Sequence, residues 1–493
     1  MSSIDVLDMS FTYEGSADEI FSHVSFRIDT DWKLGFIGRN GRGKTTFLRL
    51  LMGEHEYTGR IHSNVIFEYF PYPVRDLSVM TCDIAAEICG NEDELWKIYR
   101  ELSLLDLPED ILYRPFSTLS NGERTKVLLA AMFIRDDAFL LIDEPTNHLD
   151  METRAIVSDY LNKKKGFILV SHDRAFLDGC IDHVLSLNRT NIEVQKGNFS
   201  SWQQNKDYQD SFSIAKDEKL RRDIARLEEA AKRSADWSDK LESTKYGTKN
   251  SGLRPDRGFI GANAARMMKR AKSQQQRSEK AIEEKKGLLD NIETSDKLKI
   301  QPEKHFAKRL LTAERLSVRF GEREIFSDLS FELMAGERVA LIGKNGSGKS
   351  CILKMAAGLM PVQEGSLKTA SGLKISYVPQ DTEGLQGNLR EFAQDRGIDE
   401  SLFLTILRKM DFERSQFDKN MRDYSAGQRK KVLLAASLSE KANLYIWDEP
   451  LNYIDVLSRM QIEELLKDSE ASMLFVEHDR EFTEKIATKT IRL

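Results

Sequence analysis

Short apolar runs alternate with segments of helical periodicity along most of the chain. Residues 33–37 and 338–342 form such runs directly before glycine-rich loops, and residues 139–142 and 167–170 have the same strand-like character. Buried strands that alternate with helices predict an α/β fold in which helices pack on a mostly parallel sheet. The longest uninterrupted apolar run, Val127 to Ile134, has eight residues, whereas a membrane helix requires about 18–20. We therefore expect that the chain does not cross a membrane by itself.

The composition supports a folded protein of more than one domain. The chain has 493 residues, of which 40% are hydrophobic and 31% charged, and this length corresponds to about two to four domains. The four cysteines have no CxxC spacing, which favours reduced thiols over a metal site. The first residues are polar and then strand-like, so we expect no signal peptide and a cytoplasmic location.

The two halves of the chain are related by an internal repeat. Residues 20–26 (IFSHVSF) recur as residues 325–331 (IFSDLSF), at an offset of 305 residues. The same offset relates three further pairs of residues: Gly38 and Gly343, Ser120 and Ser425, and Asp143 and Asp448. A period this long indicates duplication of a whole domain rather than a solenoid. We therefore predict a first domain over residues 1–205, a linker over residues 206–304 and a second domain over residues 305–493.

Both copies contain a glycine-rich loop of the form GxxxxGK[ST] directly after a predicted strand. The first loop is Gly38, Arg39, Asn40, Gly41, Arg42, Gly43, Lys44 and Thr45, followed by Thr46. The second loop is Gly343, Lys344, Asn345, Gly346, Ser347, Gly348, Lys349 and Ser350. Glycines allow backbone N–H groups to approach phosphate oxygens, and the helix that follows adds its N-terminal dipole. Lys44 and Lys349 are predicted to reach the β- and γ-phosphates of ATP, while Thr45 and Ser350 place a hydroxyl on Mg²⁺.

Two acids follow an apolar strand in each copy, Asp143-Glu144 and Asp448-Glu449. The end of a buried parallel strand lies at the edge of the sheet where the phosphate loop is expected. Adjacent strand residues point to opposite faces, so the two acids can have separate roles. The first acid suits Mg²⁺, and the second suits orientation and deprotonation of the attacking water. A solvated acidic turn is the plainer alternative for one such pair, but it explains two matched pairs poorly.

Further motifs resemble those of ATP-binding cassette (ABC) proteins. Residues 119–123 (LSNGE) and 424–428 (YSAGQ) resemble the ABC signature, and His172 and His478 match the switch histidine. Residues 146–150 (TNHLD) are similar to the ABC-F subfamily, whose members carry two cassettes and a linker in one chain without membrane domains. Residues 31–44 (DWKLGFIGRNGRGK) resemble the Lsa/Vga-type antibiotic-resistance branch, especially the Lsa-type proteins. The implied fold is two ABC-type nucleotide-binding domains joined by a long α-helical hairpin.

The resemblance also implies that the cassettes face each other head to tail and enclose two ATP molecules. One site would combine Lys44, Asp143 and Glu144 with Ser425 and Gly427, and the other would combine Lys349, Asp448 and Glu449 with Ser120 and Gly122. The residues that would stack on adenine are Tyr13 and Phe320. The catalytic residues would be Glu144, Glu449, His172 and His478. The Mg²⁺ ligands would be Thr45, Asp143, Ser350, Gln380 and Asp448.

The two copies differ at positions that touch these motifs. Gln380 occupies the position of the Q-loop glutamine, whereas the first copy has Tyr72 there, which offers no amide oxygen to Mg²⁺. Two further residues of the first copy are replaced in the second: Thr146 by Leu451, and Ser171 by Glu477. We therefore predict that the two ATP sites are chemically unequal.

The predicted linker has a basic centre. Between Lys240 and Lys280 there are eleven basic and three acidic residues, while the whole chain has a net charge of −6. The flanks have helical stripes and residues 246–261 form a glycine-rich loop, so we predict a helical hairpin whose arms extend roughly 50–60 Å. A basic tip favours docking into folded nucleic acid, and a solvated coiled-coil tether is the alternative. The residues predicted to bind RNA are Lys245, Lys249, Arg254, Arg257, Arg266, Lys269 and Arg270.

The family resemblance implies a function on the ribosome. ABC-F linkers insert between ribosomal RNA elements and reach toward the peptidyl-transferase centre, so the partners would be ribosomal RNA and the peptidyl-site tRNA. Four apolar residues of the tip either press on RNA bases or a tRNA end, or only seal the hairpin: Phe259, Ile260, Met267 and Met268. The leading hypothesis is an ATPase that acts from the exit-tRNA site and protects the ribosome from lincosamides, pleuromutilins and streptogramin A compounds.

Three other functions are compatible with parts of the sequence. A housekeeping translation factor on stalled ribosomes would share every residue of the cassettes. The motor of a membrane exporter would need membrane partners and would leave the basic hairpin unexplained. A DNA-repair ATPase is the weakest alternative, because no zinc module interrupts either copy. We accordingly expect ATP and Mg²⁺ as ligands and the ribosome as partner, with neither a membrane nor DNA.

Overall fold

The structure is a computed structural model that describes residues 2–14, 19–90, 94–135, 137–147, 149–187, 192–209, 211–212, 222, 225–226, 229, 300, 302–412 and 416–493. The chain divides into two compact units, one formed by Met1–Trp202 with Ser295–Leu493 and the other by Gln203–Thr294. Within the first unit, we call the part up to Trp202 the first domain and the part from Ser295 the second domain.

Most of the predicted linker lies outside the described residues. Residues 199–209 are helical, but all seven predicted RNA-binding residues and the four apolar tip residues fall in ranges that the structure does not describe. The helical hairpin and the predicted boundaries at residues 205 and 305 therefore stay predictions.

The first domain combines nine strands and six α-helices among its described residues. Its strands are β1 (Ser3–Thr12), β2 (Glu19–Asp29), β3 (Lys33–Gly38), β4 (Thr58–His62), β5 (Ile66–Phe70), β6 (Ala138–Asp143), β7 (Phe167–Val170), β8 (His183–Leu187) and β9 (Ile192–Lys196). Its helices are α1 (Lys44–Leu51), α2 (Thr81–Cys89), α3 (Lys97–Leu104), α4 (Asn121–Met132), α5 (Met151–Asn162) and α6 (Arg174–Cys180), with 3₁₀ turns η2 (Glu109–Tyr113) and η3 (Phe116–Thr118).

The second domain repeats this order. Its strands are β10 (Arg309–Phe320), β11 (Arg323–Met334), β12 (Arg338–Ile342), β13 (Glu364–Thr369), β14 (Ile375–Val378), β15 (Leu444–Asp448), β16 (Met473–Val476) and β17 (Lys489–Arg492). Its helices are α9 (Lys349–Ala356), α10 (Leu389–Asp395), α11 (Glu400–Lys409), α12 (Ala426–Ser439), α13 (Val456–Lys467) and α14 (Arg480–Ile486), with the 3₁₀ turn η5 (Met421–Asp423).

Each domain contains the same two sheets. The first domain has an antiparallel sheet in the order β2-β1-β4 and a second sheet in the order β5-β6-β7-β3-β8-β9, which is parallel except for the last pair. The second domain has the matching orders β11-β10-β13 and β14-β15-β16-β12-β17. The predicted duplicated α/β fold with mostly parallel sheets is confirmed, and the four predicted strands coincide with β3, β6, β7 and β12.

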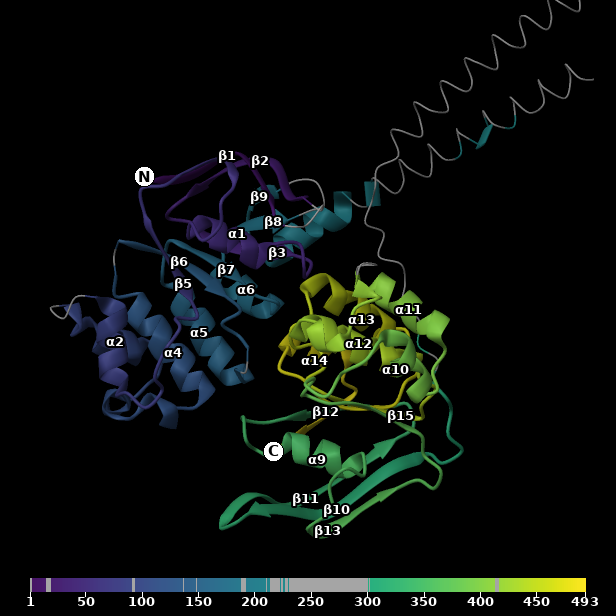
Figure 1. Cartoon of the computed structure of the whole chain (residues 1–493). Helices are drawn as coiled ribbons and strands as arrows, with labels where there is room; N and C mark the ends of the chain where they lie inside the picture. Colours follow the sequence, from purple (N-terminus) through teal and green to yellow (C-terminus); the bar gives the residue numbers. More distant parts are fainter. Residues whose placement is uncertain are drawn as a thin grey trace, which may run out of the picture. The chain divides into compact units, whose positions relative to one another are not determined.

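One helix lies between the two sheets of each domain. In the first domain, Phe47 and Leu48 of α1 pack with Ile4 and Val6 of β1 and with Phe36 of β3. In the second domain, α9 lies between β12 and the layer of β10, β11 and β13 (Figure 1). Because both helices begin at the lysine of a glycine-rich loop, this apolar packing fixes the direction in which each helix N-terminus and its loop point.

Candidate active sites

The two glycine-rich loops have the backbone geometry that a bound phosphate requires. Gly41 and Gly43 have φ angles of 84° and 96°, and Gly346 and Gly348 have φ angles of 78° and 89°. A β-carbon on Gly43 would also lie 2.5 Å from a methyl group of Ile20. These positions therefore accept glycine and few other residues.

The lysine of each loop is held inside its own loop. Lys44 Nζ donates to the carbonyl oxygens of Gly38 at 2.6 Å and Arg39 at 3.1 Å, and Lys349 Nζ donates to those of Gly343 and Lys344, both at 2.8 Å. Burial lowers the pKa of both lysines. A buried ammonium that has only carbonyl partners gains from an anion brought into the loop.

The first acid of each predicted pair meets the hydroxyl that follows the loop lysine. Thr45 Oγ1 donates to Asp143 Oδ2 at 2.9 Å, and Ser350 Oγ donates to Asp448 Oδ1 at 3.2 Å. Burial raises the pKa of Asp448 to about 6, and its Oδ2 is buried without a hydrogen-bond partner among the described residues. Such hydroxyl and carboxylate oxygens are ligands that Mg²⁺ prefers, so both sets fit the ion.

The second acid of each pair lies beside the predicted switch histidine. The distance from His172 Nε2 to Glu144 Oε1 is 3.3 Å, and the distance from His478 Nε2 to Glu449 Oε1 is also 3.3 Å. Both glutamates have positive φ angles, 52° and 45°, at the point where β6 and β15 end. Burial lowers the pKa of His172 well below its usual range, and the nearby Lys44 charge acts in the same direction.

The second site is built from both domains. A cavity of about 750 Å³ is lined by Ser120 and Gly122 of the first domain and by residues 344–346 and 348–350 of the loop of the second domain. Phe320, Gln380, Glu449 and His478 line the same cavity. Ser120 caps α4 through a hydrogen bond from the Glu123 N–H, which points the start of this helix at the cavity. The structure thus brings together the residues that the sequence grouped in one ATP site.

The first site has matching contacts in the opposite direction. Asn40 Nδ2 of the first loop donates to the carbonyl of Tyr453 at 2.6 Å. A β-carbon on Gly427 would lie 2.7 Å from this carbonyl and 3.3 Å from Asn40 Nδ2, so the signature of the second domain approaches the loop of the first. Arg42 Nη2 also donates to Asp411 Oδ2 of the second domain at 3.3 Å.

The predicted adenine-stacking residues lie at the surface near each loop. Tyr13 is 40% exposed, and its hydroxyl is 2.8 Å from Thr46 Oγ1. Phe320 is 54% exposed and lines the cavity of the second site. Both rings are therefore partly exposed near the phosphate loops, and stacking on a base requires such exposure.

Comparison with known proteins decides the family. A family model described as ABC transporter matches residues 21–147 and 326–452, which together are just over half of the chain. The chain belongs to the ABC family of ATP-binding proteins. It is 30% identical to the ribosome protection protein VmlR of Bacillus subtilis (strain 168) over 96% of this chain and 84% of that protein. It is 24% identical to the probable ATP-binding protein YbiT of Escherichia coli O157:H7 over 99% of this chain and 96% of that protein.

These whole-length relatives place the chain in the ABC-F subfamily. The fold is shared with a solved structure of the archaeal ribosome recycling factor aABCE1 in complex with the ribosomal stalk protein aP1. The TM-score is 0.64, and the sequences are 19% identical over 98% of this chain and 87% of aABCE1. This ABC-F protein is therefore an ATP-hydrolysing enzyme with two nucleotide-binding domains. In the part of the chain that the structure describes, no helix has the length and apolar character needed to span a membrane.

The two candidate catalytic glutamates of the ABC-F protein have different hydrogen-bond partners and different pKa values. Glu449 Oε2 accepts hydrogen bonds from Gln380 Nε2 at 2.9 Å and Asn452 Nδ2 at 2.6 Å. Burial acts to raise the pKa of Glu449, but His478 and Gln380 outweigh it and lower the value to about 2. Burial and the charge of Asp143 raise the pKa of Glu144 to about 8.

Tyr72 explains part of this difference. Its hydroxyl donates to Glu87 Oε1 at 3.0 Å, so it does not substitute for the amide that Gln380 gives the second site. Glu144 Oε1 is buried without a hydrogen-bond partner among the described residues. The replacement of glutamine by tyrosine therefore changes the surroundings of the glutamate as well as the oxygen ligands available to an ion.

The other sequence differences between the copies compensate one another. Thr146 Oγ1 and Ser171 Oγ lie 3.2 Å apart in the first domain. In the second domain, Glu477 Oε2 accepts the backbone N–H of Leu451 at 3.1 Å. Both arrangements join the loop after the candidate catalytic glutamate to the strand end that carries the predicted switch histidine.

Two polar contacts of the acids were not predicted from the sequence. Tyr69 donates its hydroxyl to Asp143 Oδ2 at 2.9 Å, and burial raises its pKa. Lys430 Nζ donates to the carbonyls of Pro379 at 2.9 Å and Asp448 at 3.3 Å, and burial lowers its pKa to about 8. A comparison of the two repeats could have pointed to Lys430, because the equivalent residue of the first domain is the uncharged Thr125.

The assembled groups suit phosphoryl transfer. This reaction depends on positioning and on electrostatic stabilisation of the phosphate oxygens, which the loop lysine and backbone N–H groups provide. A carboxylate beside a histidine can orient a water molecule and accept its proton. The second site offers these parts together with an amide donor to its glutamate.

Proposed function

We propose that this ABC-F protein is a cytoplasmic, ribosome-bound ATPase that protects the ribosome from antibiotics of the peptidyl-transferase centre. The observation that carries the proposal is the 30% identity to the ribosome protection protein VmlR over 96% of this chain. The motif resemblance to the Lsa/Vga-type branch supports lincosamides, pleuromutilins and streptogramin A compounds as the drugs opposed. ATP binding would close the two domains, and hydrolysis would release the protein.

The linker would carry the protective action. Its segment from Lys240 to Lys280 has a large excess of basic residues, while the whole chain has a net charge of −6. A basic tip gains affinity for ribosomal RNA by releasing counterions from phosphates. The tip would enter from the exit-tRNA site and reach the peptidyl-site tRNA and the drug pocket.

We also propose that ATP acts as its Mg²⁺ complex in both sites. The residues that would hold the ion are Thr45 and Asp143 in the first site and Ser350, Asp448 and Gln380 in the second. At these residues, Mg²⁺ would supply neutralisation of phosphate charge during transfer.

Drug susceptibility tests the ribosomal function. Cells that express the full chain should survive higher concentrations of the three drug classes than cells without the gene. Removal of Gly252 to Gly258 should abolish this protection and leave ATP hydrolysis by the purified protein unchanged. If the shortened protein still protects fully, the tip is only a spacer and the proposed action of the linker is wrong.

Ribosome co-sedimentation separates binding from protection. Arg254→Ala with Arg257→Ala should weaken sedimentation with ribosomes. The slope of log affinity against log salt concentration should become shallower by the amount that corresponds to about two phosphate contacts. Lys297→Ala with Lys299→Ala removes the same charge outside the basic segment and should change sedimentation less. Sedimentation with ribosomes but no effect on susceptibility would indicate a translation factor, and sedimentation with membranes would indicate an exporter subunit.

A further inference from the structure

The two domains meet differently on the two sides of their interface. Val456, Leu457 and Met460 of α13 pack into the hydrophobic core of the first domain. The repeat places Met151, Glu152 and Ala155 of α5 at the equivalent positions, and these three line an open cavity of about 840 Å³. One side of the interface is therefore sealed by apolar side chains and the other is hollow.

A buried ion network reinforces the sealed side. Arg174, which is 1% exposed, forms a two-point ion pair with Glu463 of α13, with Nη1 at 3.1 Å from Oε2. Its Nε lies 3.0 Å from Glu481 Oε2 of α14, and Lys485 Nζ lies 3.7 Å from Glu463 Oε2. A planar guanidinium that bonds two carboxylates fixes the orientation of both partners.

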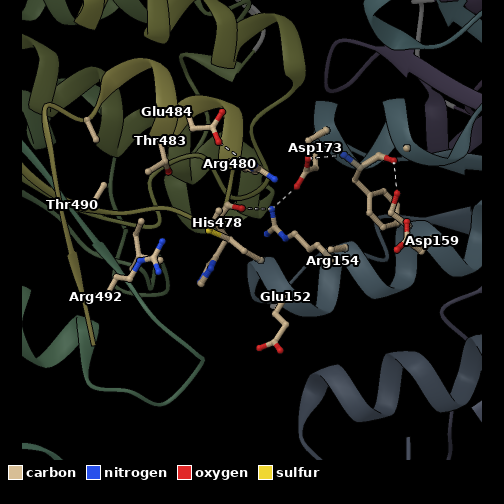
Figure 2. Close-up of a pocket in the computed structure, with 18 residues that line it drawn as sticks. Glu152, Arg154, Asp159, Asp173, His478, Arg480, Thr483, Glu484, Thr490 and Arg492 are labelled. Carbon is tan, nitrogen blue, oxygen red and sulfur yellow. Dashed lines mark hydrogen bonds and ion pairs between the residues drawn. The ribbon is translucent and has the colours of Figure 1, made fainter. Parts of the chain in front are cut away.

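On the hollow side, the described residues form no counterpart of this ion network, and a single buried hydrogen bond between described residues, from Arg154 Nη1 to the His478 carbonyl at 3.3 Å, crosses the cavity walls. The repeat matches Glu463, Glu481 and Lys485 with Ser158, Ala175 and Gly179, and all three of these small residues line the cavity. Arg480, the counterpart of Arg174, is 71% exposed along its side chain and pairs with Glu484 of its own helix at 2.7 Å. Figure 2 shows Arg480 and Glu484 on the wall from the second domain, opposite Asp159 and Asp173 on the wall from the first.

The sealed side connects the elements that line the first ATP site. Arg174 lies two residues after His172, which is 3.3 Å from Glu144. Helix α13 begins directly after Asp455, in the loop whose Tyr453 carbonyl accepts the hydrogen bond of Asn40. The hollow side connects the matching elements of the second site, His478 and α5, through the cavity walls.

We propose that Arg174 is a positioning residue that keeps the first site closed, so that the first site retains its ATP while the second site opens and exchanges nucleotide. The proposal requires only ATP binding and hydrolysis, so it stands independently of the ribosomal function. Arg174 acts through Glu463 and Glu481, because it holds the switch segment of the first domain on α13 and α14 of the second.

The burial of the network makes the effect of its loss large. Burial raises the pKa of Glu463, and Arg174 offsets this only in part. Removal of one partner from a buried pair leaves a charge without compensation, which costs far more than the loss of an exposed pair. Arg480 provides the exposed counterpart for a matched control.

The test is the release of radiolabelled ATP from the full chain that carries Glu144→Gln and Glu449→Gln, so that hydrolysis does not interfere. We expect two phases of release, of which Lys44→Ala removes the slow one and Lys349→Ala the fast one. Arg174→Ala should accelerate the slow phase at least about tenfold and leave the fast phase within about twofold. Arg480→Ala should alter neither phase. The exchange of charges in Arg174→Glu with Glu463→Arg and Glu481→Gln should restore slow release, because the third change removes the carboxylate that would otherwise repel the new glutamate.

Introducing the carboxylates of the sealed side at the equivalent positions of the hollow side gives a second test, which does not depend on the stability of Arg174 variants. Ser158→Glu with Ala175→Glu introduces two carboxylates beside Arg480 and should slow the fast phase. Gly179 stays unchanged, because a β-carbon there would lie 2.3 Å from Ser158 Oγ. A single phase of release, acceleration of both phases by Arg174→Ala, or a slow phase that belongs to the second site would overturn the proposal.

Discussion

Glu144 and Glu449 directly follow equivalent strands, β6 and β15, and each lies 3.3 Å from a histidine, yet the two carboxyl groups have different neighbours. Two amide groups donate to Glu449, whereas Glu144 Oε1 is buried without a hydrogen-bond partner among the described residues. The pKa of Glu449 is lowered to about 2 and that of Glu144 is raised to about 8. Duplication has thus preserved the candidate catalytic groups, while the residues around them set different chemical properties.

The same contrast extends to the contacts across the interface. The first loop bonds to the second domain through Asn40 and Arg42. In the second loop, Lys344 Nζ lies 2.9 Å from Glu152 Oε2, where both side chains are mostly exposed, and the backbone N–H of Asn345 hydrogen-bonds to Asp150 of the first domain. Exposed ion pairs contribute little, so the side-chain ion pair of the second loop stabilises closure less than the Asn40 and Arg42 contacts of the first loop. The comparison indicates that contacts between the domains stabilise the closed form of the first site more than that of the second site.

The largest effect is expected when both glutamates are changed. Glu144→Gln with Glu449→Gln keeps the size of each side chain and removes the proton acceptor. ATP turnover should fall at least about 100-fold, because general base catalysis supplies an effect of this order. Nucleotide should remain bound, which filter binding of radiolabelled ATP measures. Turnover at the normal rate would mean that these glutamates are not the bases.

Single substitutions then divide the turnover between the sites. Glu449→Gln should lower steady-state turnover nearly as far as the double change, because the second site exchanges its nucleotide in each cycle. Glu144→Gln should lower it less than about fivefold. Coupled-enzyme assays at saturating ATP measure the ratio of the residual turnover rates of the two variants. Equal residual rates would remove the distinction between the two sites.

Much of this comparison could be read from the sequence. The repeat and the apolar runs predicted strands that coincide with β3, β6, β7 and β12, and the loop motifs end where α1 and α9 begin. These features are local, because glycine geometry and strand burial depend on a few adjacent residues. The tyrosine at position 72, where the second copy has Gln380, is likewise evident from the sequence alone.

The long-range contacts could not be read in the same way. Arg174 and Glu463 are 289 residues apart, and nothing near either residue in the sequence indicates the other. Tyr69 likewise reaches Asp143 only because β5 pairs with β6. The repeat does show that Ser158 and Gly179 replace charged residues, but their meaning depends on which surfaces the domains bring together.

A reciprocal exchange at the Q-loop position sharpens the role of the amide. Gln380→Tyr removes the donor to Glu449 Oε2 and should lower turnover about tenfold, the value of one charge-assisted hydrogen bond. Tyr72→Gln should change turnover less than about threefold, because only the bond to Glu87 is lost and the first site contributes little turnover. The same ATPase assay compares the two variants. A larger effect of the first-domain change would reverse our assignment.

The smallest effect concerns the loops that follow the glutamates. Glu477→Ala leaves the buried N–H of Leu451 without its acceptor and should lower the free energy of unfolding by about 1–3 kcal/mol. Ser171→Ala removes the hydroxyl contact with Thr146 and the acceptor of the buried Asp173 N–H, so it should also cost about 1–3 kcal/mol, but it leaves the bond of Leu451 intact. Hydrogen exchange of the peptide that contains Leu451 should become faster in the first variant and stay unchanged in the second. Glu477→Gln provides the decisive control, because it keeps an acceptor for Leu451 and removes a carboxyl whose pKa is raised by burial. If Gln restores slow exchange, the hydrogen bond holds the loop; if exchange stays as fast as with Ala, the charge of Glu477 holds it instead.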